Sequence, residues 1–214
     1  MNGRHAVLVG LCGRSGAGKG YVASLFSLFG IPSVDTDAVY RTLTAPSQSL
    51  SPCMKALRDR FGDGIVCPDN SLNRPALRAL VFGGDGTALN DLNAISHRFI
   101  LLETERIADA LAERGADVVL IDAPVLYESG FDKKCARVVC VTAPEDVSIR
   151  RITERDGLSP ADAKRRLDAQ MSNEELRARA DYAVENDGSP AIFDRVARCA
   201  AELLKLRKGA GGKG

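Results

Sequence analysis

Long hydrophobic runs, an excess of charge of one sign and paired cysteine motifs are all missing from this 214-residue sequence. No apolar stretch approaches the roughly 20 residues that a membrane-spanning helix needs. The net charge is +1, so no overall basic field attracts nucleic acid or an anionic membrane. The remaining composition, 45% hydrophobic and 27% charged, is that of a soluble globular protein with a sizeable core.

The cysteines form no C-x-x-C pair and lack matching histidines, since the sequence holds only two. We therefore expect the six cysteines to be reduced thiols rather than disulfides or zinc ligands. Cys12 is expected to be a small buried residue at the end of a strand. The segment before the first expected strand leaves no room for a signal peptide, which predicts a cytoplasmic protein.

A phosphate-binding loop is the strongest motif that is present. Residues 13–19 read G-R-S-G-A-G-K, and they lie between the apolar run 6–11 and an amphipathic segment. The glycines let backbone N–H groups converge on a phosphate, and the start of the following helix adds positive potential. Lys19 would bring a full charge to the β- and γ-phosphates. The Ser or Thr that usually follows this lysine and holds Mg²⁺ is replaced by Gly20.

Acidic residues follow two of the expected strands. Asp35 and Asp37 come after the second strand, at the edge of the sheet where α/β folds bind ligands. One of them is expected to cap the next helix and the other to act in catalysis, and we expect Asp37 to be the base. Asp122 ends the run 118–121 and is expected to hold Mg²⁺, with Asp35 as a second metal residue.

The order of apolar and amphipathic segments predicts an α/β protein with a parallel sheet. Strands are expected at residues 6–11, 32–35, 117–121, 137–142 and 182–185.

Long segments between these strands divide the expected core, which comprises 1–36, 116–149 and 180–208. Residues 37–115 read as helices and predict an inserted helical subdomain that binds the second substrate. Residues 150–179 contain eight Lys or Arg and six acids, and they predict a lid over bound phosphates. The alternative is a solvated helical hairpin with i,i+4 ion pairs. Residues 209–214 are expected to be a disordered tail.

Taken together, these motifs resemble the dephospho-CoA kinase family over most of the chain, from Gly10 to Asn186. The matching segments are G-L-C-G-R-S-G-A-G-K at 10–19, D-T-D at 35–37, F-G at 61–62, L-N-R at 72–74, P-V-L-Y-E at 124–128, R-D-G-L-S at 155–159 and A-D-Y at 180–182. The resemblance implies a P-loop kinase-like three-layer α/β/α fold with a five-stranded parallel sheet. It also implies transfer of the ATP γ-phosphate to the ribose 3′-hydroxyl of dephospho-CoA, the final step of CoA biosynthesis.

The resemblance assigns roles to individual residues and names ATP and dephospho-CoA as partners, with Mg²⁺ beside ATP. Residues implied to bind ATP are Gly13, Arg14, Ser15, Gly16, Ala17, Gly18, Lys19, Gly20, Tyr21 and Asn186. Residues implied to bind dephospho-CoA are Asp37, Arg74, His97, Pro124, Glu128 and Arg166. Lys19, Asp37, Arg151 and Arg155 are the expected catalytic residues, either of the two arginines meeting the charge that develops on the phosphate.

Two residues depart from the family pattern: Gly20 replaces Ser or Thr, and Arg98 replaces the proline after His97. Two other functions therefore stay open. The chain could be another small-molecule P-loop kinase, or a non-catalytic nucleotide-binding protein on the same scaffold. The sequence does not predict an oligomeric state.

Overall fold

A computed structural model describes residues 5–83 and 86–210 of the chain. The chain divides into two compact units. Residues up to Val34 together with those from Ile107 onward form the first unit, and Asp35–Arg106 form the second. No helix in the described ranges is long and apolar enough to cross a bilayer.

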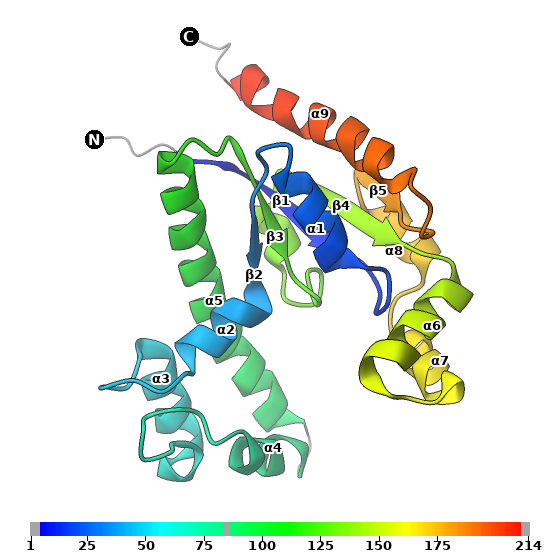
Figure 1. Cartoon of the computed structure of the whole chain (residues 1–214). Coiled ribbons are helices and arrows are strands. Elements are labelled where there is room, and N and C mark those ends of the chain that lie inside the picture. The colour runs from blue at the N-terminus through cyan, green and yellow to red at the C-terminus, as the bar shows by residue number, and fades with distance from the viewer. Residues whose placement is uncertain (1–4, 84–85, 211–214) are drawn as a thin grey trace. The chain divides into compact units, whose positions relative to one another are not determined.

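The first unit is built on a five-stranded sheet with the strand order β2-β3-β1-β4-β5 (Figure 1). The strands are β1 (Val7–Cys12), β2 (Ser33–Asp35), β3 (Val118–Asp122), β4 (Arg137–Thr142) and β5 (Tyr182–Glu185). β1 pairs in parallel with β3 and β4, and β4 pairs in parallel with β5. All five predicted strands are therefore confirmed, each within one residue of its expected bounds.

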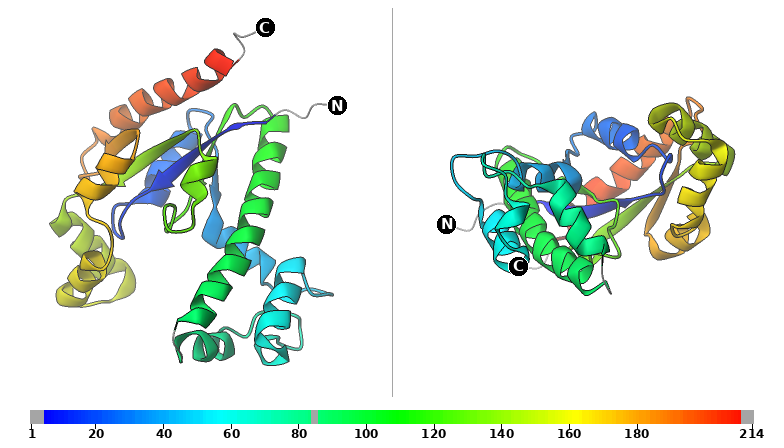
Figure 2. Two further views of the ribbon diagram at one scale, coloured as in Figure 1. Left: turned by 180° about the vertical axis from the view of Figure 1, so that it is seen from behind. Right: turned by 90° about the horizontal axis from the view of Figure 1, so that it is seen from below.

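Helices cover both faces of this sheet, which confirms the expected three-layer fold. Helices α1 (Lys19–Ser27) and α9 (Ile192–Ala210) lie on one face, and α8 (Asn173–Arg179) lies on the other (Figure 2). The apolar residues of α1 and α9 pack against those of the strands, with Phe26 and Leu203 fully buried. Such continuous burial is what parallel strands require, since they are covered on both sides.

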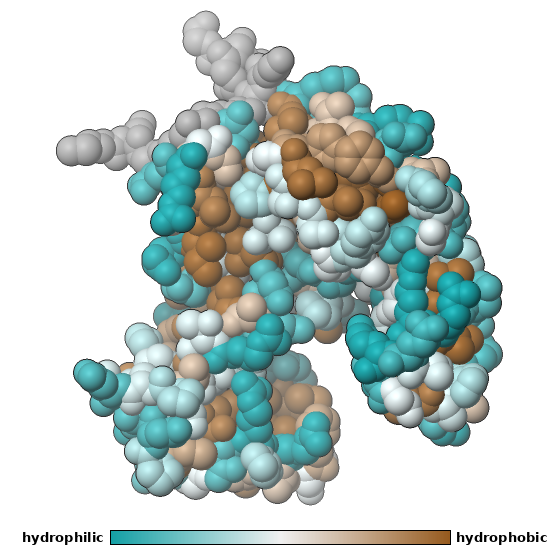
Figure 3. Space-filling model, viewed as in Figure 1, coloured by the Kyte–Doolittle hydropathy of each residue, from teal (hydrophilic) through white to brown (hydrophobic). Residues whose placement is uncertain are grey.

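Hydrophobic side chains also reach the surface on the face that carries α1 and α9 (Figure 3). Leu28, just after α1, is exposed, and the ring of Phe193 on α9 lies 5.4 Å from that of Phe29. Gly209 and Ala210, which the sequence assigned to the tail, belong to the last turn of α9, because the helix continues two residues beyond the expected end. Residues 211–214 of that expected tail lie outside the described residues.

The expected lid, residues 150–179, takes in most of α6 (Glu145–Asp156), all of α7 (Pro160–Asp168) and also α8. Gly157 ends α6 in the left-handed conformation, and Ser159 caps α7 by accepting the N–H of Asp162. Ile152 packs with two residues of α7 in a small separate core. The hairpin thus folds around its own apolar contacts.

The second unit consists of helices with a core of its own. Its helices are α2 (Thr36–Leu43), α3 (Pro52–Phe61), the 3₁₀ turn η1 (Asp63–Ile65), α4 (Arg74–Phe82) and the first part of α5 (Thr87–Glu113). Its core includes Met54, Leu57 and Ile65, all nearly or completely buried. The expected insertion 37–115 corresponds to this unit at its start but extends too far at its end. The reason is that α5 is one continuous helix, whose last turns from Ile107 belong to the first unit.

Candidate active site

The phosphate-binding loop connects β1 to α1, as the motif predicts. Gly18 caps α1 in the left-handed conformation, with φ 82°, which residues other than glycine rarely adopt. Gly16 also has a positive φ, and a Cβ there would lie 2.5 Å from the carbonyl oxygen of Ser148. The N–H of Ala17 donates to the carbonyl of Arg14 at 3.1 Å and closes the turn. Glycine is thus required both by backbone conformation and by close packing against α6.

Lys19 and Asp122 meet beside this loop. Lys19 is the first residue of α1 and Asp122 the last of β3, whose register places Asp122 opposite Leu11 of β1. Lys19 Nζ donates to Asp122 Oδ1, and the two side chains are only 16% and 15% exposed. The lysine charge is therefore held at the mouth of the loop by a carboxylate that has little access to water. The sequence predicted both residues but not their contact.

The site offers few side chains that could coordinate a metal ion. Among the residues that the structure describes, no three His, Cys, Asp or Glu side chains come together as a metal site. Asp122 alone still fits Mg²⁺, since that ion usually takes one or two carboxylates and completes its shell with substrate phosphates and water.

Asp35 has a different local role from the metal role expected of it. Its Oδ1 accepts the N–H groups of Asp37 and Ala38 at 2.8 and 3.1 Å, so it is the N-cap of α2. Its Oδ2 also faces Arg41 at 3.4 Å. Of the two roles that the sequence gave to the Asp35–Asp37 pair, capping thus falls to Asp35. Asp37, in the first turn of α2, keeps an exposed side chain.

Gly20 provides a direct test of the metal site. A Cβ at this position meets no atom within 4 Å, so serine fits there without displacing a neighbour. We expect Gly20→Ser to lower the Mg²⁺ concentration that gives half-maximal activity, because it restores an oxygen ligand. Gly20→Ala is the matched control, since it adds the same carbon without the hydroxyl. Equal Mg²⁺ dependence of the two variants would contradict the prediction.

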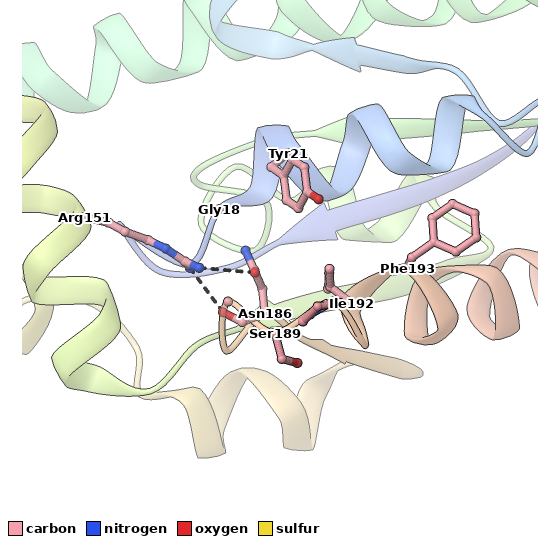
Figure 4. Close-up of a pocket in the computed structure, with 9 residues that line it drawn as sticks. Gly18, Tyr21, Arg151, Asn186, Ser189, Ile192 and Phe193 are labelled. Carbon is pink, nitrogen blue, oxygen red and sulfur yellow. Dashed lines mark hydrogen bonds between the residues drawn. The ribbon is translucent and has the colours of Figure 1, made fainter.

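A pocket of about 730 Å³ opens beside the start of α1 (Figure 4). Tyr21 and Asn186, both expected to bind ATP, line it together with Gly18. Sequence reasoning missed its other wall, which is formed by Ser189, Ile192 and Phe193. The available signal was the polar turn N-D-G-S-P at 186–190, directly after the last strand at the carboxyl edge of the sheet. An open pocket with aromatic and aliphatic walls suits a planar base.

Arg151 points from α6 into this pocket and toward the phosphate loop (Figure 4). Its Nη1 donates to the carbonyl oxygens of Gly16 and Asn186, both at 3.2 Å, and its Nη2 donates to Asn186 Oδ1 at 3.3 Å. Asn186 is 3% exposed, and its Nδ2 donates to the carbonyl of Ala17 at 2.8 Å. Arg151 thus contacts backbone oxygens of the phosphate loop. The sequence alone could not distinguish this contact from a direct contact with the bound phosphate.

Arg155 and Arg166 share one carboxylate in the lid. Arg155 donates to both oxygens of Asp156 at 2.7 and 2.9 Å, and Arg166 donates to Asp156 Oδ2. The two guanidinium groups, with Arg155 the stronger partner, hold the pKa of Asp156 well below its usual range. The shared carboxylate keeps these two cations close together on the hairpin.

A second cavity, of about 330 Å³, lies between the loop at 124–128 and the end of α7. Pro124 and Glu128, both expected at the substrate, line it together with Gln170. Gln170 Oε1 accepts the N–H of Ser15 at 2.9 Å, a contact that the sequence did not predict. The side chain of Arg14 donates to the carbonyl of Leu167 at 2.5 Å. The phosphate loop and the lid segment are therefore in direct contact.

Cys12 is buried at the end of β1, as expected, and all six cysteines are free thiols. Its ladder partner in β4 is Cys140. A hydrogen bond with the Cys140 thiol, aided by Tyr127 and by the charge of Lys19, lowers the pKa of Cys12.

The second unit carries the other expected substrate residues. Arg74 begins α4, donates to Thr44 Oγ1 at 3.3 Å and lies over the ring of Tyr40, 5.6 Å from its centroid. His97, on α5, is half-buried, and this burial lowers its pKa, so its imidazole is neutral at pH 7. Both residues lie on helices that the sequence assigned to the insertion.

A parallel sheet of this order, with a phosphate loop and its lysine after β1, is the arrangement of the P-loop kinase class. The profile of the dephospho-CoA kinase family matches residues 7–191. The dephospho-CoA kinase of Syntrophotalea carbinolica is 37% identical over 95% of each chain, and that of Anaeromyxobacter dehalogenans is 38% identical over 92% of each chain. The chain belongs to the dephospho-CoA kinase family.

Solved structures share the fold of this chain. A Thermus thermophilus protein of known crystal structure is 30% identical and aligns with a TM-score of 0.75 over 94% of this chain and 98% of its own. The dephospho-CoA kinase from Campylobacter jejuni, 20% identical, aligns with a TM-score of 0.55 over 92% of this chain and 98% of its own. A shikimate kinase from Bacteroides thetaiotaomicron, 15% identical, shares the fold with a TM-score of 0.52 over 93% of this chain and 98% of its own.

Proposed function

We propose that the chain phosphorylates dephospho-CoA with ATP through the residues described above. The chain is a phosphotransferase of CoA biosynthesis, and its reaction makes CoA and ADP. The observation that carries the residue-level proposal is the Lys19–Asp122 pair at the mouth of the phosphate loop. Phosphoryl transfer requires mainly alignment of the reactants and neutralisation of charge. The pair fixes the lysine charge beside the loop, where it can neutralise charge on the phosphates.

On the donor side, backbone N–H groups of the loop at 13–20 other than those of Ser15 and Ala17, which already donate within the protein, hold the phosphates, and Lys19 neutralises their charge. The base occupies the pocket beside Tyr21 and Asn186, whose walls are open and partly apolar. Mg²⁺, bound with ATP, would be held by Asp122 and would neutralise charge on the phosphate oxygens. Of the lid arginines, Arg155 is the one that meets the transferred phosphate, because its side chain is 63% exposed whereas the guanidinium of Arg151 is bound to the loop.

On the acceptor side, Asp37 accepts the proton of the ribose 3′-hydroxyl or orients that hydroxyl for attack. Its exposed carboxylate lies in the first turn of α2, while Asp35 holds the helix end in place. Arg74 and His97 bind dephospho-CoA within the second unit, and Pro124, Glu128 and Arg166 do so in the first. His97 acts as a neutral hydrogen-bonding group, since its lowered pKa keeps it uncharged at pH 7.

The experiment that tests this proposal is ADP release from the purified protein with ATP, Mg²⁺ and dephospho-CoA. We expect ADP only when the acceptor is present. Asp37→Asn should lower kcat by about 10²–10⁴-fold while leaving the KM for ATP unchanged, because general-base assistance contributes about that much.

The matched control is Asp63→Asn, which removes a 97%-exposed carboxylate from the same unit and should leave kcat unchanged. Equal loss in the two variants would contradict the role of Asp37. ATP binding without acceptor-dependent ADP would favour a non-catalytic nucleotide-binding protein. Turnover with a nucleoside but not with dephospho-CoA would favour a different small-molecule kinase.

A further inference from the structure

Five hydrogen bonds join Arg151 and Asn186 to backbone oxygens of the phosphate loop and to each other. Arg151 reaches Gly16 and Asn186 from α6, and Asn186 reaches Ala17 from the turn after β5 (Figure 4). These acceptors are neutral oxygens, so the arginine keeps its full positive charge beside the loop. We propose that Arg151 and Asn186 form a brace that sets the phosphate-binding shape of the loop. This inference rests on the proposed function and adds two positioning residues to it.

The first step of the argument concerns the peptide between Ala17 and Gly18. In a trans peptide the carbonyl and the N–H point in opposite directions. Asn186 Nδ2 holds the Ala17 carbonyl at 2.8 Å, and Arg151 Nη1 lies 3.5 Å from the same oxygen. Fixing this carbonyl therefore turns the N–H of Gly18 to the opposite side, toward the concave face that receives a phosphate.

The second step concerns the rigidity of the brace itself. Asn186 is 3% exposed, and its own N–H donates to the carbonyl of Thr142 on β4 at 2.7 Å, which ties it to the sheet. Arg151 is fixed by four acceptors rather than one. A Cβ on Gly18 would clash with Asn186 Nδ2, so the loop is packed directly against the brace. The loop thus needs little rearrangement to bind phosphate, which lowers the cost of binding.

The third step separates Arg151 from Arg155. Both lie on α6, four residues apart and thus on one helix face, but they have different partners. Arg155 is bound to the carboxylate of Asp156 and is 63% exposed, whereas Arg151 is bound to backbone oxygens of the loop. A brace acts on every ligand that places a phosphate in the loop. An arginine that meets the transferred phosphate acts only when that phosphate is present.

This difference defines the test, which uses calorimetric binding of three probes: inorganic pyrophosphate, adenosine and ADP. We expect Arg151→Ala and Asn186→Ala to weaken pyrophosphate and ADP by about tenfold each, the effect of losing a charged hydrogen-bond network. Adenosine affinity should change by less than about twofold. Arg150→Ala, the matched control that removes an exposed arginine from the same helix, should leave the affinities for pyrophosphate and ADP unchanged.

Arg151→Lys keeps the charge and the alkyl stem but not the planar fork, so it tests geometry in a variant that disturbs folding least. We expect it to weaken pyrophosphate binding by an intermediate factor. Wild-type affinity in this variant would overturn the brace, because charge alone would then suffice. Weaker adenosine binding with unchanged pyrophosphate in Arg151→Ala would overturn it too and place Arg151 on the base.

These binding measurements do not depend on turnover. If the chain failed to phosphorylate dephospho-CoA, the proposed function would fall, yet pyrophosphate binding would still report on the loop. If turnover were normal and Arg151→Ala bound all three probes like the wild type, only the brace would fall. The two failures are therefore distinguishable.

Discussion

Replacing Lys19 with alanine is expected to lower kcat by about 10³-fold or more, because the variant loses the lysine charge that the loop motif brings to the β- and γ-phosphates. The pair that Lys19 forms with Asp122 is mostly buried, with side chains 16% and 15% exposed. Its charge is therefore screened little by water, and its loss costs more than that of a surface lysine. Initial rates of ADP release at saturating ATP and dephospho-CoA measure the effect.

The control for this experiment is Lys205→Ala, which removes an exposed lysine of α9 that pairs with Glu202. It should leave kcat unchanged, since exposed ion pairs contribute little. A Lys19→Ala protein that retains wild-type kcat would show that the loop charge is not needed for transfer. Thermal unfolding of both variants shows whether a decrease in kcat is due to unfolding of the protein.

The second large effect is expected from Arg155→Ala. An arginine that stabilises the charge developing on a transferred phosphate is worth about 10³–10⁵ in kcat in related phosphotransferases. In this chain the guanidinium of Arg155 is held by both oxygens of Asp156 and is exposed on the lid hairpin. We expect single-turnover measurements to show a loss in the chemical step with unchanged affinity for ADP.

Arg165→Ala is the matched control, because Arg165 lies on the same hairpin, is 77% exposed and also pairs with an aspartate, Asp162. Its loss should change kcat by less than about twofold, the effect of an exposed pair. If both variants lost activity equally, the hairpin would act through its overall charge rather than through Arg155. If Arg155→Ala kept full activity, the solvated-hairpin alternative would be favoured for this residue.

Features that depend on neighbouring residues in the chain were predictable from the sequence. The five strands follow from short runs rich in apolar residues that alternate with longer amphipathic segments. The end of α6 at Gly157 and the start of α7 at Ser159 follow from capping chemistry within four residues. The phosphate loop follows from its glycines, because their φ values and close packing admit no other residue type at Gly16 and Gly18.

The boundary between the two units was not predictable in the same way. Helix α5 runs without interruption from Thr87 to Glu113, and its apolar pattern does not reveal which unit each turn packs against. The sequence placed the boundary where the helix ends, near Gly115. The structure places it inside the helix, at Ile107, because packing partners rather than helix ends define a compact unit.

By itself, then, the sequence determined the class of fold, the phosphate loop and its lysine, since each depends on local spacing and on residue types that only one backbone conformation accepts. Tertiary structure alone decided which charged residues meet. It paired Lys19 with Asp122, gave the capping role to Asp35 and directed Arg151 to the loop rather than to the lid carboxylate. Residues 19 and 122 are far apart in the chain, and only the parallel pairing of β1 with β3 brings their ends to one edge.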